Sequence, residues 1–409
     1  MHGKIILLLL ELTGVAAFAP ISPTNAMVST PRIPPPLPDK LVIGYCSWSQ
    51  CDDKIISAVR NGVNVVIWFS LNLVGDGVEW RDSPTPECVA DIVQRIRELD
   101  GGSKVVHLMS IGGWNSPHPD TMRSPQEVFL DLDRWNREVI ARPDKGWLGF
   151  DGWDWDIEGN DDVDSKHNHF SKDCLDMMGI VAQCAKRHGY IFGMAPAESY
   201  LDPSTPLFDR SLRHDYPEWR ELQPDFKYHG RNCYAFLLAK YGRTTVGTVT
   251  AEEAGAGCLE DICGSSQAPT VSTFDFVTIQ LYEGYSHAEY SLNVLKADPA
   301  AYIVALVEQF QTGWSVEFGS DHELGFTTNA VTVVVPPTQL VLGLANGWAG
   351  DGKFYFLNAD RLADVSARLR EANLPIRGFA FWNIQDEGMA SKSDPSTPVY
   401  LARVLKEIL

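Results

Sequence analysis

Eight short apolar runs rich in β-branched residues recur along the chain and constrain its fold more than any other feature. They span residues 41–46, 63–69, 105–111, 147–157, 190–195, 274–282, 340–344 and 376–382. Several are nearly continuous rather than alternating, as expected for strands that are covered on both faces. Stretches with helical spacing of apolar residues lie between them, for example over residues 86–99, 126–140, 171–187, 300–312 and 358–372. Strand and helix in regular alternation predict an α/β fold, a (β/α)8 TIM barrel.

The segments outside this pattern suggest how the chain is organised. Residues 1–26 carry Lys4 followed by an apolar stretch, which is typical of a secretory signal and is too short for a membrane span. Residues 27–39 form a Pro-rich linker, and residues 40–409 form the barrel. Between the fifth and sixth strands, residues 201–273 are too long for one barrel connection and predict an insertion at the rim. We expect a secreted protein; an alternative destination is a plastid, because the leader also resembles bipartite plastid-targeting signals.

The charge and the cysteines narrow the possible partners and compartment. The formal net charge of −19 repels polyphosphates and anionic membranes, so we expect no nucleic-acid partner and no stable membrane insertion. A neutral substrate is not repelled, and we expect a monomer. Eight cysteines are an even number, compatible with disulfides in an oxidising compartment. The closest pairs in the sequence, Cys46 with Cys51 and Cys258 with Cys263, are the simplest expectation for local bridges.

Residues 151–158 read Asp-Gly-Trp-Asp-Trp-Asp-Ile-Glu and place Asp154, Asp156 and Glu158 on alternate positions of the fourth strand. Alternate strand residues share a face, so we expect these acids to face the barrel axis and the intervening tryptophans to face the helices. At roughly 3.3 Å per residue, the acids climb toward the carboxyl end, where barrel active sites lie. Neighbouring carboxylates raise one another's pKa, which suits a general acid. Metal binding is the alternative, which an apolar, tryptophan-flanked strand disfavours.

The same residues carry a family resemblance. Residues 151–158 resemble the D-G-x-D-x-D-x-E motif of glycoside hydrolase family 18, the chitinase family. Residues 110–113, Ser-Ile-Gly-Gly on the third strand, match a second motif of that family, S-x-G-G. The resemblance extends to Tyr282 on the sixth strand and to Trp382 at the end of the eighth. It implies a single catalytic domain over residues 40–409 that binds chitin or another N-acetylglucosamine-containing glycan.

The resemblance also implies a substrate-assisted mechanism, in which the N-acetyl oxygen of the sugar attacks the anomeric carbon. Glu158 would be the catalytic acid and base, Asp156 would bind the acetamido nitrogen, and Asp154 would tune both neighbours. Tyr282 would donate to the acetamido oxygen, and Trp382 would lie beneath the sugar. No metal and no cofactor are implied. Supporting or substrate-binding roles are expected at further matched positions, which are Ser110, Gly112, Gly113, Met194 and Asp151.

Some positions leave alternatives open. Met194 is equally compatible with plain packing, and Trp48, Trp114 and Trp348 with either sugar stacking or rim packing. Glu283 and Gly159 depart from residues common in the family, which leaves the cleavage preference open. An endo-β-N-acetylglucosaminidase acting on N-glycan cores is the alternative enzyme. A chitin-binding lectin without activity is the alternative of another class, although family lectins typically lack one of the acids that are present here.

Overall fold

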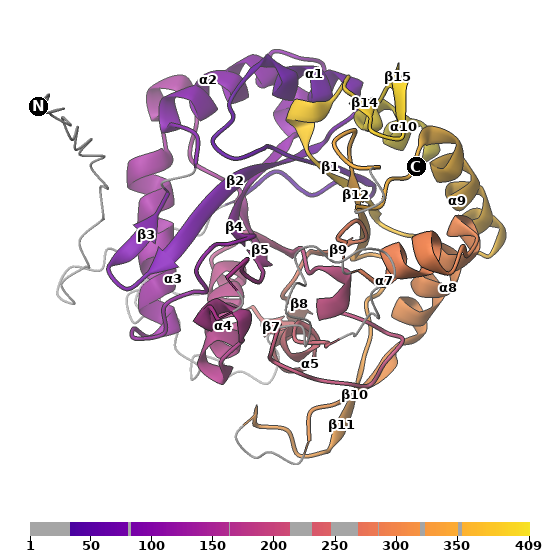
Figure 1. Ribbon diagram of the computed structural model, residues 1–409. Coiled ribbons are helices and arrows are strands. Elements are labelled where there is room, and N and C mark those ends of the chain that lie inside the picture. The colour runs from indigo at the N-terminus through magenta and orange to yellow at the C-terminus, as the bar shows by residue number, and fades with distance from the viewer. Residues whose placement is uncertain are drawn as a thin grey trace, which may run out of the picture.

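Eight parallel strands close into a barrel, and helices form a ring around them in the computed structural model (Figure 1). The structure describes residues 33–80, 83–162, 164–212, 231–246, 269–284, 286–319, 324–350 and 354–409. In barrel order the strands are β1 (Leu41–Tyr45), β2 (Val65–Val74), β4 (Val106–Gly113), β5 (Gly152–Ile157), β6 (Ile191–Met194), β9 (Phe276–Gln280), β12 (Leu340–Ala345) and β13 (Gly378–Trp382). Pairing of β1 with both β13 and β2 closes the barrel. The predicted (β/α)8 fold is confirmed.

One helix follows each barrel strand. The helices are α1 (Asp53–Asn61), α2 (Pro86–Arg97), α3 (Pro125–Arg134), α4 (Lys172–Arg187), α5 (Ala235–Tyr241), α8 (Pro299–Thr312), α9 (Ala359–Glu371) and α10 (Leu401–Ile408). Polar side chains cap most of their first turns and accept otherwise unpaired backbone N–H groups. At α3, Ser124 and Glu127 form a reciprocal capping box. The helix starts are therefore specified locally by the sequence.

Two apolar layers follow from the alternation of side chains along the strands. Trp153 and Trp155 of β5 pack in the layer between the strands and the helices, together with apolar residues of the helix ring. Leu41, Ile43 and Val65 belong to a separate cluster inside the barrel. Because the strands are buried on both faces, their apolar runs are nearly continuous, as the sequence indicated.

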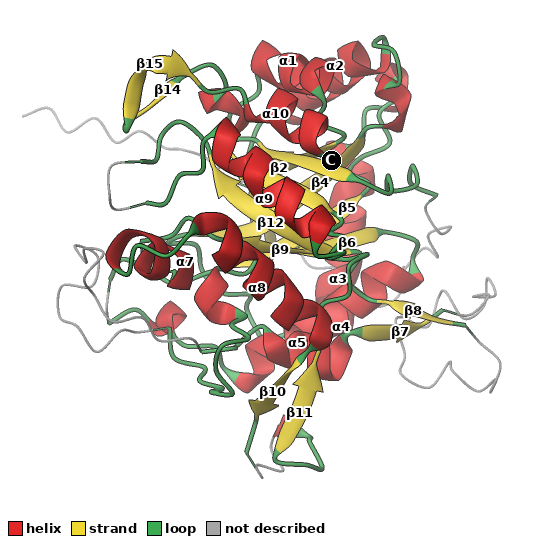
Figure 2. Ribbon diagram, turned by 90° about the vertical axis from the view of Figure 1, so that its right-hand side faces the viewer, coloured by secondary structure: helices red, strands yellow, loops and turns green. Residues whose placement is uncertain are grey.

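Several short elements add to the barrel. The short strand β3 (Gly77–Glu79) pairs antiparallel with β2, and α7 (His287–Glu289) is a single helical turn. Three two-stranded sheets pair β7 (Arg243–Thr245) with β8 (Thr270–Ser272), β10 (Trp314–Glu317) with β11 (Ala330–Val333), and β14 (Ala390–Ser391) with β15 (Asp394–Pro398). Figure 2 shows β7 and β8, and likewise β10 and β11, projecting from the barrel. The described part of the predicted insertion 201–273 contains α5, which completes the helix ring. Residues 213–230 and 247–268 of the predicted rim insertion, and the leader at residues 1–26, lie outside the described residues.

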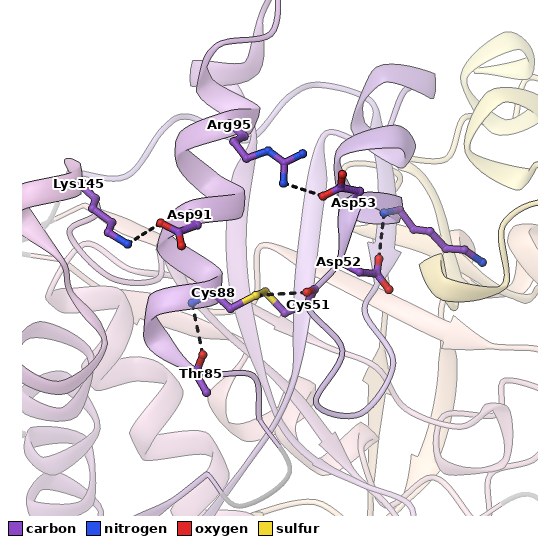
Figure 3. Close-up of a disulfide and its surroundings, with 9 residues drawn as sticks. Cys51, Asp52, Asp53, Thr85, Cys88, Asp91, Arg95 and Lys145 are labelled. Atoms are coloured by element: carbon purple, nitrogen blue, oxygen red, sulfur yellow. Dashed lines mark hydrogen bonds and ion pairs between the residues drawn. A yellow bond between two sulfur atoms is a disulfide. The ribbon is translucent and has the colours of Figure 1, made fainter.

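The cysteine pairing differs from the expectation of a local bridge. Cys51 pairs with Cys88 rather than with Cys46, and their Cα atoms are 6.2 Å apart (Figure 3). This disulfide joins the segment before α1 to the first turn of α2, and an Arg95–Asp53 ion pair of 2.6 Å links the same two helices. Cys46 is a buried free thiol. The expected Cys258–Cys263 bridge lies outside the described residues.

Within the described ranges, no helix has both the length and the apolar character needed to cross a membrane.

We predict that the Cys51–Cys88 disulfide stabilises the fold by constraining the unfolded chain. It bridges a sequence separation of 37 residues, for which a loss of about 2–4 kcal/mol on removal is typical. Replacing both cysteines by serine should lower the urea midpoint of unfolding. Each single replacement should have a similar effect, because either one removes the bridge. Unchanged midpoints in all three variants would contradict a stabilising role.

Candidate active site

Three acids of β5 form a buried row at the centre of the site. Asp154 and Asp156 lie within the strand, and Glu158 follows its last residue, Ile157. Their exposed fractions are 0%, 7% and 5%, so the carboxyl groups are largely withdrawn from water. The tryptophans between them pack toward the helices. The alternation expected from strand geometry is therefore present, with the acids on the axial face.

Hydrogen bonds from two other strands hold this row. The Tyr45 hydroxyl of β1 donates to Asp154 Oδ2 at 2.8 Å. Gln280 Nε2, at the end of β9, lies 2.8 Å from Asp156 Oδ1, 2.9 Å from Glu158 Oε1 and 2.6 Å from the Ala195 carbonyl oxygen. An amide nitrogen has two hydrogens, so these three acceptors share them. Gln280 thus draws the carboxyl groups of Asp156 and Glu158 to one point.

Burial dominates the electrostatics of the acids, because it disfavours their charged forms. It raises the pKa of Asp154 to about 7, against the effect of the Tyr45 hydrogen bond. Burial, followed by the charges of Glu158 and Asp154, raises the pKa of Asp156 well above its usual range. Burial also raises the pKa of Glu158, although hydrogen bonds from Gln280 and Asp156 act in the opposite direction. The row therefore retains protons near neutral pH.

A pocket opens above the acids at the carboxyl end of the barrel. Its cavity volume is about 10 Å³, and its lining includes Tyr45, Asp156, Gln280, Tyr282 and Trp382. The predicted tyrosine and tryptophan thus line the same pocket as Asp156, whereas Asp154 and Glu158 are not in its lining. Among the residues that the structure describes, no group of three or more His, Cys, Asp or Glu side chains could hold a metal ion.

Two side chains from the loops that connect strands and helices, Tyr234 and His118, form hydrogen bonds with the backbone of Ile157 and Glu158. The Ile157 N–H donates to the Tyr234 hydroxyl at 2.8 Å, and that hydroxyl donates to the Ile157 carbonyl oxygen at 2.9 Å. The His118 Nε2 donates to the Glu158 carbonyl oxygen at 3.0 Å, and its ring stacks on Phe170 at a centroid distance of 4.5 Å. Burial lowers the pKa of His118 to about 4. A neutral imidazole therefore supports the peptide of Glu158.

The S-x-G-G residues lie beside the acids on β4. Ser110 pairs in register with Asp154, and Gly112 with Asp156. Both glycines have φ near +105°, and a Cβ on Gly113 would lie 2.4 Å from the ring of Phe69. The structure therefore supports a spacing role for the glycines, whereas the sequence placed them at the substrate.

Two other predicted site residues lie away from the pocket. Met194 is fully buried on the helix side of the barrel, in register with Trp155, which favours packing, the alternative that the sequence left open. Ala195, the next residue, lines the pocket instead. Asp151 lies at the opposite end of β5, where Oδ2 accepts the His107 N–H at 2.9 Å. It supports the base of the strand, below the acids.

The sequence predictions missed four residues of the site, which are Tyr45, Gln280, Tyr234 and His118. Strand alternation could have indicated the first two, because both point inward near the ends of their strands. Tyr234 and His118 come from connections without periodicity, and no sequence signal marks them.

Comparison with known proteins finds a likeness of fold. No protein-family model matches the sequence, and no curated protein matches it. A family GH18 chitinase from Chromobacterium violaceum is similar in structure with a TM-score of 0.51 and 14% identity, covering 91% of this chain and 84% of that chain. A fungal endo-β-N-acetylglucosaminidase from glycosyl hydrolase family 18 has a TM-score of 0.47 and 14% identity, with coverages of 91% and 99%. The first likeness establishes the shared barrel fold.

We predict that Tyr234→Phe destabilises the protein although it removes only one oxygen atom. The variant leaves the N–H and carbonyl groups of Ile157 without this partner in a buried position, a loss that costs about 1–3 kcal/mol. Urea unfolding will measure it. Tyr400→Phe, at a half-exposed tyrosine, is the matched control and should be neutral. An equally small effect at both positions would contradict a supporting role for the Tyr234 hydroxyl.

We predict that the contribution of Asp154 to the stability of the protein falls as the pH rises from about 4 to about 7. Asp154 has a folded-state pKa of about 7, whereas an unfolded aspartate titrates near 3.9. Between these values the folded state binds more protons, so the free energy of unfolding decreases with pH. Asp154→Asn should reduce this slope in urea unfolding at pH 4, 5.5 and 7.5. The exposed Asp360→Asn is the control; equal slopes in wild type and Asp154→Asn would refute the assignment.

Proposed function

We propose that the chain is a glycoside hydrolase of family 18 that cleaves β-1,4-linked N-acetylglucosamine chains. The observation that carries the proposal is the buried row of Asp154, Asp156 and Glu158 at the carboxyl end of the barrel. Gln280 binds both Asp156 and Glu158, and Asp156 lines the pocket. The barrel fold shared with a family GH18 chitinase supports it. So does the presence of Tyr282 and Trp382 in the same pocket lining as Asp156.

Glu158 acts as the general acid in this proposal. Burial raises its pKa, so it keeps a proton at the pH at which a leaving oxygen must be protonated. Proton transfer to that oxygen breaks the glycosidic bond, and the resulting carboxylate then takes a proton from water. The anomeric configuration is retained, because the acetamido oxygen of the sugar first attacks the anomeric carbon and water then replaces it.

Asp156 and Tyr282 organise the acetamido group. Asp156 lies in the pocket lining and shares the Gln280 amide with Glu158, so its carboxyl group is placed to accept the acetamido N–H as positive charge develops. The Tyr282 hydroxyl, for which burial raises the pKa, stays protonated and donates to the acetamido oxygen. Asp154, bonded to Tyr45 below, sets the charge of the row.

We also propose that the protein works in an oxidising compartment outside the cytosol. The Cys51–Cys88 disulfide and the charge-then-apolar layout of residues 1–26 support this location. Secretion is the first alternative and a plastid reached through the secretory pathway the second.

Glu158→Gln should abolish cleavage of chitooligosaccharides while the protein remains folded. General acid–base groups contribute about 10²–10⁴-fold to rate, and we expect a loss of at least this size in kcat/KM. Glu308→Gln, at an exposed position of α8, is the control. The first product of the wild type should be the β-anomer, by nuclear magnetic resonance.

The outcomes separate the alternatives. Equal activity of wild type and Glu158→Gln would refute the role of Glu158. Cleavage of a high-mannose glycopeptide but not of chitooligosaccharides would assign the chain as an endo-β-N-acetylglucosaminidase. Binding of chitooligosaccharides without cleavage of either substrate would indicate a lectin.

A further inference from the structure

A buried carboxyl group outside the acid row lies near the site. Glu198 has an exposed fraction of 0% and begins a short 3-10 turn, residues 198–200, after β6. The backbone just before it runs beside the end of β9, where the Gln280 N–H donates to the Pro196 carbonyl oxygen at 3.0 Å. Glu198 takes no part in the reaction proposed above. Burying a carboxyl group costs free energy unless hydrogen bonds compensate, so the partners of Glu198 indicate its role.

The partners of Glu198 belong to the elements that follow β9. Glu198 Oε2 accepts the backbone N–H of Ala288, in α7, at 2.7 Å, and Oε1 accepts the Tyr302 hydroxyl of α8. Figures 1 and 2 both show α7 beside α8. α7 and the π-helical turn after it (Tyr290–Val294) are short, and short helices depend on contacts outside themselves. Glu198 therefore anchors α7 to the barrel.

The N-cap of α7 is bonded to the backbone on each side of Tyr282. The Ser286 hydroxyl accepts the Glu289 N–H at 3.0 Å and donates to the Leu281 carbonyl oxygen at 3.2 Å. The Ser286 N–H donates to the Glu283 carbonyl oxygen at 2.9 Å. A displacement of α7 would therefore be passed to the peptide groups that carry Tyr282, which lines the catalytic pocket.

Glu198 holds a proton near neutral pH. Burial raises its pKa to about 8, against hydrogen bonds from Tyr302 and the Ala288 backbone, and the charge of Asp202 adds to the rise. An amide has the shape of a neutral carboxyl group and also has one carbonyl oxygen that can accept a backbone N–H. Glu198→Gln should therefore preserve the contact with α7, whereas Glu198→Ala removes it.

We propose that Glu198 is a positioning residue for the reaction, which acts through α7 and Ser286 on Tyr282. The inference rests on the proposed glycosidase function, in which the Tyr282 hydroxyl holds the acetamido oxygen in line for attack. On the barrel side the backbone is already fixed, since the Leu281 N–H donates to the Gly343 carbonyl oxygen of β12 at 3.0 Å. Glu198 fixes the other side through α7.

The test measures kcat and KM for the substrate that the wild type cleaves, a chitooligosaccharide or a high-mannose glycopeptide. Glu198→Ala should lower kcat by about 10- to 100-fold with little change in KM, the size of loss that a displaced reacting group causes. Glu198→Gln should recover most of this loss. Glu308→Ala, which removes an exposed carboxyl group from α8, is the control and should match the wild type.

Double variants separate positioning from a general loss of stability. If Glu198 acts through the Tyr282 hydroxyl, Glu198→Ala should lower kcat much less in the Tyr282→Phe background than in the wild type. Ser286→Ala cuts the link to the Leu281 carbonyl oxygen and leaves the Glu198 contact in place. It should show the same dependence on Tyr282, and it tests the inference even where Glu198→Ala does not fold.

Two results would overturn the positioning role and leave the glycosidase function intact. One is a loss of kcat that is equally large in the presence and absence of the Tyr282 hydroxyl. The other is a Glu198→Gln variant as slow as Glu198→Ala. A wild type that cleaves neither substrate would overturn both the inference and the function on which it rests.

Discussion

The shared amide of Gln280 is the interaction on which the candidate site depends. Without it, Asp156 and Glu158 would be two neighbouring carboxyl groups in a low-dielectric interior, where each disfavours ionisation of the other. One side-chain nitrogen, 2.8 Å and 2.9 Å from their oxygens, brings both to one point and stabilises negative charge on either. Its third acceptor, the Ala195 carbonyl oxygen, anchors the amide to β6. The site therefore exists only when β5, β6 and β9 are assembled.

The barrel buries three acids close together and provides partners for their carboxyl groups. Each carboxyl group has a partner on another strand or an acid neighbour with which it shares a proton, as buried polar groups require. Tyr45 reaches Asp154 across 109 residues of sequence, and Gln280 reaches Asp156 across 124. The opposite faces of the same strands supply apolar packing, with Trp153 in the outer layer. Stability and chemistry are thus divided between the two faces of each strand.

Much of this arrangement could be predicted from the sequence, because strand alternation is fixed by backbone geometry. Period two placed Asp154 and Asp156 on one face of the strand, and the predicted barrel made that face the axial one. The partner of each acid could not be predicted, since pairs so distant in sequence meet only when the barrel closes. The face of Met194 stayed open, because an apolar residue reads alike on both faces of a doubly covered strand. Tyr234 lies on a connection that has no period at all.

The glycines of β4 show how a motif can set the spacing of a site. A Cβ on Gly112 would lie 2.6 Å from the carbonyl oxygen of Asp156, so any other residue would force β4 away from the acid strand. Its φ of +105° is likewise one that other residues rarely adopt. Gly113, with a similar φ, leaves room for Phe69, which packs at 4.7 Å against Trp382 of the pocket lining. The S-x-G-G and acid motifs therefore belong together, because the first sets the spacing at which the second can be held.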